Sequence, residues 1–336
     1  MRVRRTATVL VMLAVALGAW AFTSRATAPA APIPLVRAVE SVAITVGDMQ
    51  TAVEFYTRVL RFEKISDATV EGEGHERLHA VPGARVRTIR LRLGQEHLDL
   101  VEYLSPRGRP VPVDSRSNDR WFQHVAIIVN DMDQAYAWLR RHKVKPISPE
   151  PQRLPDWNVN AAGIRAFYFQ DPDGHPLEIL QFPPDKGNPR WQRPSDSVFL
   201  GIDHTAIVVD DTDRSLAFYR DALGMRVVGE SENYGPEQAL LNNVSGAHLR
   251  ITTLRAESGP AIELLQYLTP RDGRPLPADA RPNDVVTWQT RLIVGDAGGA
   301  RASLSGRFTF LSTATVGHAF VGRDPDGHLL VVATRP

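Results

Sequence analysis

The sequence predicts an α+β protein whose folded part repeats a βαβββ module four times. Residues 40–65 align with 203–228, and residues 118–131 align with 283–296 without a gap, which indicates a tandem duplication. Within each copy, a β-branched strand, an acidic turn and a helix occur twice. A DPDGH turn follows near the end of each copy. These three observations set the fold class.

The first 30 residues stand apart from this pattern. The basic stretch MRVRR is followed by an apolar run of 15 residues, TVLVMLAVALGAWAF, and then by small residues. This order is typical of a secretory signal, and the run is shorter than the roughly 20 residues of a spanning helix. We therefore expect 1–30 to be a signal peptide or an N-terminal anchor, and the protein to be exported, either periplasmic or secreted.

Composition narrows the range of partners. The hydrophobic content of 43% and the charged content of 23% are those of a globular protein. Residues 1–30 hold four arginines and no acids, so removing them changes the formal charge from +1 to −3 and leaves no basic patch for nucleic acid. Because the chain has no cysteine, any metal must be held by His, Asp or Glu. We expect a small-molecule ligand, and membrane contact only through an uncleaved anchor.

Each module is predicted to begin with a strand that leads through an acidic turn into a helix. The strand at 123–129 alternates between two faces, as a half-buried strand does. Asp131, and Asp210 or Asp211 in the next copy, stand where an N-cap acceptor belongs. In the helix after Asp131, residues 135–139 place Ala, Trp and Leu on one stripe.

The rest of each module is predicted to be strands. HLDLVEYL and GIRAFYFQ are strand-like, and the DPDG turn joins the last two strands of a module. The fourth helix, in GDAGGARASLSG, is predicted to be weak because it is rich in glycine. The modules are expected at 38–105 and 120–183 and, after a proline-rich linker at 184–198, at 199–269 and 285–334.

The strand HTAIVV, the helix SLAFYRDALGM and the ending DPDGHPLEIL resemble the vicinal oxygen chelate superfamily, which includes glyoxalase I, methylmalonyl-CoA epimerase, extradiol dioxygenases and bleomycin-resistance proteins. The resemblance covers about residues 38–334. It implies that modules pair into two cup-shaped open β-barrel domains, which we place at 38–183 and 199–334. It also implies that each module offers one metal ligand from its first strand and one from its last.

Mapping the resemblance residue by residue gives an uneven set of ligands. From the first module to the fourth, the positions are Ser41 and Asp99, His124 and Glu178, His204 and Glu263, and Gln289 and Val331. If the two middle modules pair with each other, His124, Glu178, His204 and Glu263 form one site for a divalent ion such as Zn, Ni, Co, Mn or Fe. If the modules pair in sequence, Asp99, His124 and Glu178 are the expected set.

Crossed pairing also accounts for a difference between the repeats. Glu178 follows the first DPDGH turn, whereas Val331 follows the second. We interpret Val331 as the mark of a duplicated site that has lost its metal. His175 and His328, inside the two turns, are expected to serve the turns themselves.

The resemblance implies an enzyme in which the metal stabilises an enolate, of the isomerase, epimerase or lyase type. Glu178 is the first candidate for the base and Glu263 the second. Two alternatives stay open: an extradiol-type dioxygenase with His124, His204 and Glu178 around ferrous iron, and a metal-free protein that binds and sequesters a small molecule. A vestigial structural protein is a third. Internal duplication favours a monomer, because the second half-site is already in the chain.

Overall fold

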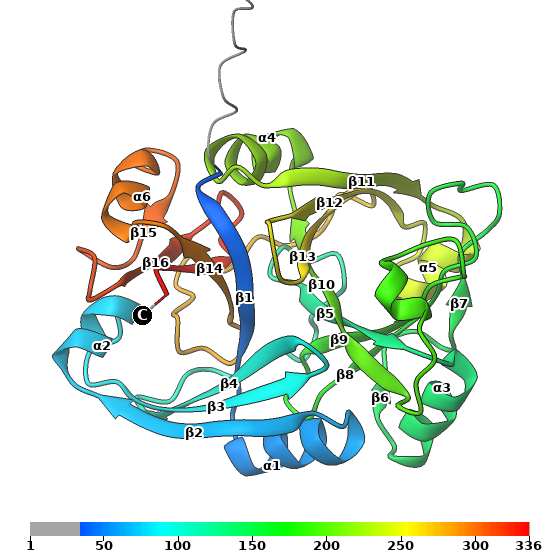
Figure 1. Ribbon diagram of the computed structural model, residues 1–336, viewed down its shortest axis with the longest axis horizontal. Coiled ribbons are helices and arrows are strands. Elements are labelled where there is room, and N and C mark those ends of the chain that lie inside the picture. The colour runs from blue at the N-terminus through cyan, green and yellow to red at the C-terminus, as the bar shows by residue number, and fades with distance from the viewer. Residues whose placement is uncertain (1–33, 336) are drawn as a thin grey trace, which may run out of the picture. The chain divides into compact units, whose positions relative to one another are not determined.

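The structure is a computed structural model that describes residues 34–335 (Figure 1). The predicted signal or anchor at 1–30 lies outside the described residues. Within the described part, no helix has the length and apolar character that crossing a membrane requires.

The first two modules follow the predicted order of a strand, a helix and further strands. The first contains β1 (Val36–Thr45), α1 (Met49–Glu54), β2 (Glu63–Glu71), α2 (Glu73–His79), β3 (Arg85–Leu93) and β4 (Glu96–Ser105). The second contains β5 (Gln123–Val129), α3 (Met132–Arg141), β6 (Lys145–Pro146), β7 (Gln152–Arg153), β8 (Arg165–Gln170) and β9 (Pro176–Gln181). A π-helical turn, Phe55–Val59, extends α1.

The last two modules repeat this order. The third contains β10 (Phe199–Val209), α4 (Thr212–Leu216), β11 (Arg226–Asn233), α5 (Pro236–Asn242), β12 (His248–Arg255) and β13 (Ala261–Thr269). The fourth contains β14 (Trp288–Val294), α6 (Ala297–Ser303), β15 (Thr309–Phe310), β16 (Ala319–Arg323) and β17 (Leu329–Ala333). A π-helical turn, Ala217–Ala222, extends α4, and a 3-10 helix, Pro189–Gln192, lies in the linker.

Local signals explain where the helices begin. Asp131 accepts a hydrogen bond from the backbone N–H of Gln134, and Asp211 rather than Asp210 caps the helix of the third module. The glycine-rich fourth helix forms as α6, with Asp296 capping its first turn. Helices α2 and α5 were not predicted, because both are short insertions between strands and carry little apolar periodicity.

Two sheets result, and each joins modules that are not consecutive. The eight-stranded sheet has the order β15-β16-β17-β14-β1-β4-β3-β2, so it combines the fourth module with the first. The nine-stranded sheet has the order β11-β12-β13-β10-β5-β9-β8-β6 and combines the third module with the second. In both sheets the two first strands pair antiparallel at the centre, and each runs parallel to the last strand of its own module. The pairing is therefore crossed.

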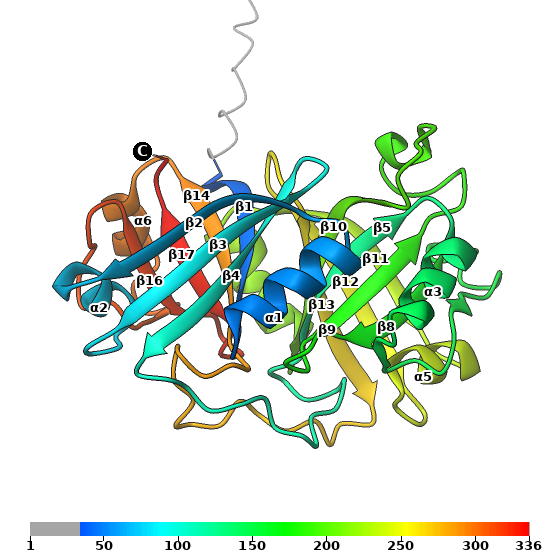
Figure 2. The same ribbon diagram turned by 90° about the horizontal axis from the view of Figure 1, so that it is seen from below.

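Consecutive modules are joined through their helices instead. One hydrophobic cluster packs Met49 and Tyr56 of the first module with Met132 and Leu139 of the second. A second cluster does the same for the third and fourth modules. Residues 38–183 and 199–334 thus each supply one module to each sheet, and the cores between consecutive modules hold the two sheets together (Figure 2).

The connections between modules cross each other at glycine residues. An ideal Cβ on Gly108 would collide with the carbonyl oxygen of Asn283, and one on Gly273 with that of Asn118. Next to these contacts, the Arg109 guanidinium donates to Asp284 at 2.6 Å, and Arg274 makes the equivalent bond to Asp119 at 2.7 Å. These reciprocal contacts explain why both repeats carry a Gly-Arg-Pro sequence followed later by Asn-Asp.

The DPDGH turns also connect the two sheets. His175 lies 2.9 Å from the Asp171 carboxylate through Nδ1, and its Nε2 donates to the carbonyl oxygen of Val285 in the fourth module at 2.6 Å. Burial opposes a charged imidazole, but the adjacent Asp171 outweighs burial and raises the pKa of His175. His328 makes the equivalent contact to the carbonyl oxygen of Val208 at 2.9 Å. Both histidines bond within their turns through the backbone, as predicted, and their rings in addition bond to the neighbouring sheet.

Candidate metal centre

The four residues predicted for crossed pairing lie on four neighbouring strands of the nine-stranded sheet. His124 on β5 is opposite Ala206, and His204 on β10 is opposite Ala126. Glu178 on β9 is also opposite Ala126, and Glu263 on β13 is opposite Ala206. Because side chains alternate along a strand, these register positions place all four on one face of the sheet.

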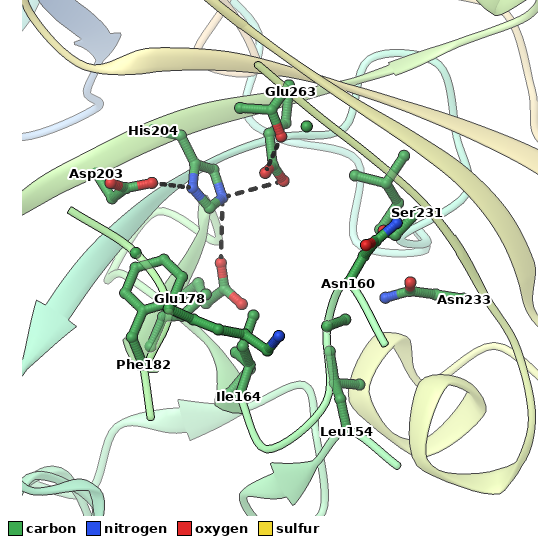
Figure 3. Close-up of a pocket in the computed structure, with 18 of the residues that line it drawn as sticks. Leu154, Asn160, Ile164, Glu178, Phe182, Asp203, His204, Ser231, Asn233 and Glu263 are labelled. Atoms are coloured by element: carbon green, nitrogen blue, oxygen red, sulfur yellow. Dashed lines mark hydrogen bonds and ion pairs between the residues drawn. The ribbon is translucent and has the colours of Figure 1, made fainter. Parts of the chain in front are cut away.

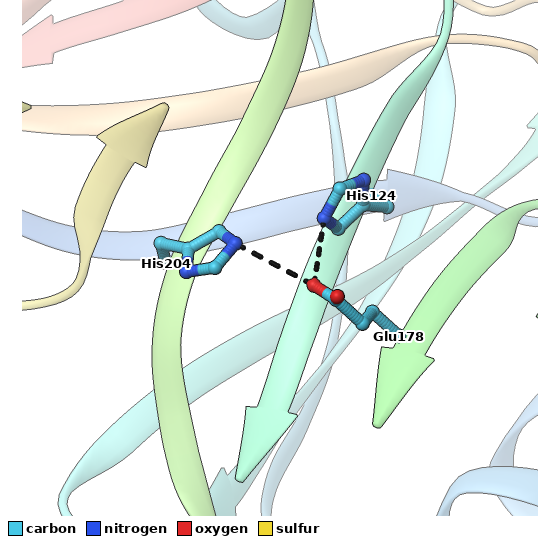
Figure 4. A group of neighbouring side chains, drawn as sticks. All are labelled: His124, Glu178 and His204. Atoms are coloured by element: carbon cyan, nitrogen blue, oxygen red, sulfur yellow. Dashed lines mark hydrogen bonds and ion pairs between the residues drawn. The ribbon is translucent and has the colours of Figure 1, made fainter. Parts of the chain in front are cut away.

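Three of these side chains form a tight group (Figure 4). Glu178 Oε2 lies 3.1 Å from His124 Nε2 and 3.6 Å from His204 Nε2. One ligand atom from each of the three residues lies within 4.8 Å of the others. All three are buried, with relative exposures of 1% for His124, 4% for Glu178 and 3% for His204. This geometry could hold a metal ion.

Glu263 completes the predicted set from the cavity side (Figure 3). Its Oε2 lies 3.4 Å from His204 Nε2, and its Oε1 accepts a hydrogen bond from the Thr253 hydroxyl at 2.7 Å. Its side chain is 19% exposed, so it is more accessible than Glu178. The two carboxylates therefore approach the same ring nitrogen of His204.

The pKa values of Glu178 and His204 depend on the contacts between the charged side chains of this site. Burial alone would disfavour ionised Glu178, but hydrogen bonds from His124 and His204 outweigh burial and lower its pKa. Burial likewise disfavours a charged His204, whereas Glu263, Asp203 and Glu178 raise its pKa well above the ordinary value. Glu178 and His204 therefore favour each other's charged form.

Asp203 is a neighbour of the site that sequence reasoning missed. Its Oδ2 lies 3.2 Å from His204 Nδ1. Its Oδ1 accepts from Trp191 Nε1 at 3.1 Å and from the Arg255 guanidinium at 2.8 Å. Adjacent strand residues normally point to opposite faces, but a bulge between Ile202 and His204 disturbs this alternation. The sequence contained one signal that could have identified Asp203: it is an acidic residue directly before the candidate ligand His204.

A carboxylate behind a ligating histidine fixes the ring's tautomer. In the neutral ring that a metal requires, Nδ1–H would donate to Asp203 and the lone pair of Nε2 would be left for the ion. His124 differs, because its Nδ1 is buried and has no hydrogen-bond partner among residues 34–335. The two imidazoles are therefore supported unequally.

A cavity of about 580 Å³ opens beside the group, within the usual size range of small-molecule sites. Its walls include Glu178, His204 and Glu263, segments of the linker, and residues of β11 and α5. Linker residues 186–189 form part of the rim, so the linker contributes to the site as well as connecting the two copies.

The matching positions of the eight-stranded sheet form no comparable group. Ser41 donates to Asp99 Oδ2 at 2.7 Å, and Arg90 binds both oxygens of Asp99 at 2.7 and 2.9 Å. Val331 packs in an apolar cluster with Leu78 of α2. Gln289 lies opposite Ala43 on the central strand pair. An arginine thus occupies the place at the carboxylate that a cation would need.

The alternative ligand set Asp99, His124 and Glu178 is not assembled. Asp99 belongs to one sheet, whereas His124 and Glu178 belong to the other. That set required the modules to pair in sequence. The antiparallel pairing of β5 with β10 takes the place where the first module would have docked.

Comparison with known proteins agrees with this arrangement. A family model described as the Glyoxalase/Bleomycin resistance protein/Dioxygenase superfamily matches residues 38–179 and 201–332. The chain belongs to this superfamily. Crystal structures of glyoxalase I from Zea mays (TM-score 0.54, 16% identity, covering 89% of this chain and 92% of that one) and of a putative dioxygenase from Bacillus subtilis (TM-score 0.55, 15% identity, 90% and 87%) share the fold.

Two proteins with named activities are similar in sequence. A 2-epi-5-epi-valiolone epimerase from an Actinomyces species is 35% identical over 156 residues, which are 45% of this chain and 82% of the relative. Lactoylglutathione lyase GLX1 from Arabidopsis thaliana is 27% identical over 187 residues, which are 56% of this chain and 54% of the relative. The second match thus spans about half of that lyase.

Proposed function

We propose that this chain is a metal-dependent enzyme that moves a proton next to a carbonyl group of a small, oxygen-rich substrate, as an epimerase or isomerase does. One observation carries the proposal: His124, Glu178 and His204 converge beside a cavity, with Glu263 on its wall. The epimerase among the relatives supports this reaction class.

The residues present fit a divalent ion. Glu178 is a carboxylate buried between two imidazoles, which is costly unless a cation balances it. Two imidazoles and two carboxylates suit Zn, Ni, Co, Mn or Fe, and the absence of cysteine excludes a thiolate site. We propose that His124, Glu178 and His204 hold the ion, with Glu263 as a fourth ligand.

The chain's own residues supply the proton transfer. When bound, the ion would act as a Lewis acid toward two adjacent oxygens of the substrate. Glu263, and not Glu178 as the resemblance implied, is the better placed base when it is not bound to the ion, since it is the more exposed carboxylate and Thr253 holds only one of its oxygens. Glu178, which approaches the same ring nitrogen of His204, would take up a proton from solvent and deliver it to the opposite face of the carbon. Two carboxylates beside one carbon are what an epimerisation needs.

Metal content of the purified full chain tests this function. We expect one divalent ion per chain by mass spectrometry of metals, lost in His204→Ala and kept in Asp99→Asn, whose carboxylate lies in the other sheet. The loaded protein should then exchange deuterium from D₂O into the carbon beside the carbonyl of a 2-hydroxyketone, and Glu263→Gln should abolish the exchange. A full chain that binds no metal after reconstitution would contradict the proposal.

A dioxygenase is the second candidate, because the tight group consists of two histidines and one carboxylate. That reading requires ferrous iron and oxygen consumption with a catechol. Oxygen uptake by iron-loaded protein, together with no deuterium exchange, would favour it over the epimerase.

We also propose that the protein acts outside the cytoplasm, on the basis of the residue pattern at 1–30. Fractionation of bacterial cells that produce the full chain, followed by N-terminal sequencing, would show whether the segment is removed. A protein recovered uncleaved from the cytoplasm would contradict this.

A further inference from the structure

Part of the cavity opposite the candidate metal centre is lined by polar, uncharged side chains. Figure 3 shows Asn160, Ser231 and Asn233 across the cavity from His204. Gln238 of α5 also lines this wall. The proposed proton transfer uses none of these groups.

A chain of hydrogen bonds fixes the amides of this wall. Asn158 donates to Asn233 Oδ1 at 2.7 Å, and Asn233 donates to Gln238 Oε1 at 3.0 Å. Gln238 donates in turn to Asn242 Oδ1, and Asn242 donates to the Tyr267 hydroxyl at 2.7 Å. All five side chains are buried. Each amide oxygen in the middle of the chain is used as an acceptor, so the bonds run in one direction.

Because the hydrogen bonds run in this direction, each cavity-lining amide keeps one N–H group that the network does not use. A side-chain amide has two N–H groups, and Asn233 and Gln238 each spend one of them inside the chain. Both residues line the cavity, so their second N–H groups are available to a bound molecule. Because the network holds the amides in place, these donors are oriented before a ligand arrives.

The charges around the cavity select against anions. Four carboxylates line it, from Glu178, Asp203, Glu230 and Glu263, against two cations, Lys186 and Arg255. Both cations are engaged: Lys186 donates to the carbonyl oxygen of Val159 at 2.7 Å, and Arg255 donates to Asp203 at 2.8 Å. The formal charge of the lining, with neutral histidines, is −2. A divalent ion would bring it to zero, so the completed cavity offers an anionic group no excess positive charge.

We propose that Asn233 and Gln238 form a subsite for the hydroxyl groups of an uncharged, polyhydroxylated ligand. Amide N–H groups donate to hydroxyl oxygens, and the neutral cavity disfavours phosphorylated or carboxylated molecules. This proposal rests on the proposed function in one respect, the orientation of the ligand. The carbonyl group would face His204, and the hydroxyl groups farthest from it would face Asn233 and Gln238.

The test is calorimetric titration of the full chain with three uncharged probes. Scyllo-inosose carries a ketone and a ring of hydroxyls, 2-hydroxycyclohexanone lacks the distant hydroxyls, and myo-inositol lacks the ketone. The variant Gln238→Met removes the cavity donor and keeps the side-chain size. Gln266→Met is the matched control, because it makes the same substitution at another buried glutamine, which bonds to Thr212 and belongs neither to this network nor to the cavity lining. Melting temperatures verify that both variants fold.

With Co²⁺ bound, Gln238→Met should weaken scyllo-inosose binding by about 3- to 10-fold, the effect of one lost hydrogen bond, and leave 2-hydroxycyclohexanone unchanged. Gln266→Met should change neither by more than about 2-fold. Myo-inositol should also bind to the metal-free chain, and Gln238→Met should weaken that binding by the same factor of about 3 to 10. This arm separates the subsite from the metal-dependent function.

Three results would overturn the subsite. The first is equal binding of scyllo-inosose by the parent chain and Gln238→Met, which would leave the metal chemistry intact. The second is binding of myo-inositol 1-phosphate as tight as that of myo-inositol, which would contradict the selection of uncharged ligands. The third is that neither myo-inositol nor scyllo-inosose binds to any form of the protein.

Discussion

Glu178 and Val331 occupy matching places after the two DPDGH turns, yet only the turns are alike. The aspartate and histidine of each turn bind across to the other sheet, as His175 does to Val285 and His328 to Val208. The turns therefore help to join the two sheets, whereas the residue at position 178 or 331 lies within one sheet only. A valine at position 331 is therefore compatible with the fold, whereas the carboxylate of Glu178 is part of the candidate metal centre.

Asp203 gives the first prediction. Asp203→Asn keeps the shape of the side chain but removes the charge that supports His204, so the affinity for a divalent ion should fall by about 10- to 100-fold. Competition with a chromophoric chelator measures this. Glu40→Gln is the control, since Glu40 holds the equivalent position in the first module and bonds to Arg291. Equal losses in both variants would contradict a specific role for Asp203.

At the scale of elements, the crossing loops decide how the modules are connected. Gly108→Ala should destabilise the protein by about 2 kcal/mol or more, because the added methyl group meets the carbonyl oxygen of Asn283. Gly74→Ala, in α2, should be neutral or slightly stabilising, since its nearest neighbour, Val316, is 3.9 Å away and alanine favours helices. Urea unfolding of both variants measures the difference, and similar midpoints would show that the crossing loops tolerate a side chain.

Helix α2 carries a pH-dependent contribution. Burial of His79, aided by His75 and Arg291, lowers its pKa to about 3, whereas an unfolded histidine titrates near 6.5. Below pH 6.5 the unfolded chain therefore binds a proton that the folded chain does not, and stability falls as the pH decreases toward 3. His79→Gln should remove up to about 1 kcal/mol per pH unit of this slope, as measured by urea midpoints at pH 7 and pH 5. An unchanged slope would mean that His79 is not the group responsible.

For the whole molecule, the two sheets already pair every module with another. The central strands β1 and β14, and β5 and β10, cover each other's edges. We predict that the full chain is a monomer, with the mass of one chain by light scattering across a tenfold dilution. A dimer that dissociates on dilution would indicate that another edge or face completes the assembly.

The sequence by itself determined the module, its four copies, and the residue types that could bind a metal. These are local or periodic properties: alternation in strands, aspartate caps before helices, and the DPDGH turn. Helices α2 and α5 escaped prediction because they are short and depend on the strands around them. The role of Asp203 escaped because it depends on a bulge that tertiary pairing creates.

Only the tertiary structure decided which modules share a sheet. Both pairings satisfy the same local patterns, because every module presents a similar first strand as the edge to be paired. The contacts that distinguish them are far apart in the chain: the reciprocal loop crossings at Gly108 and Gly273, and the packing of α1 against α3. That choice brings His204 to His124 and Glu178, and leaves Asp99 with Arg90 in the other sheet.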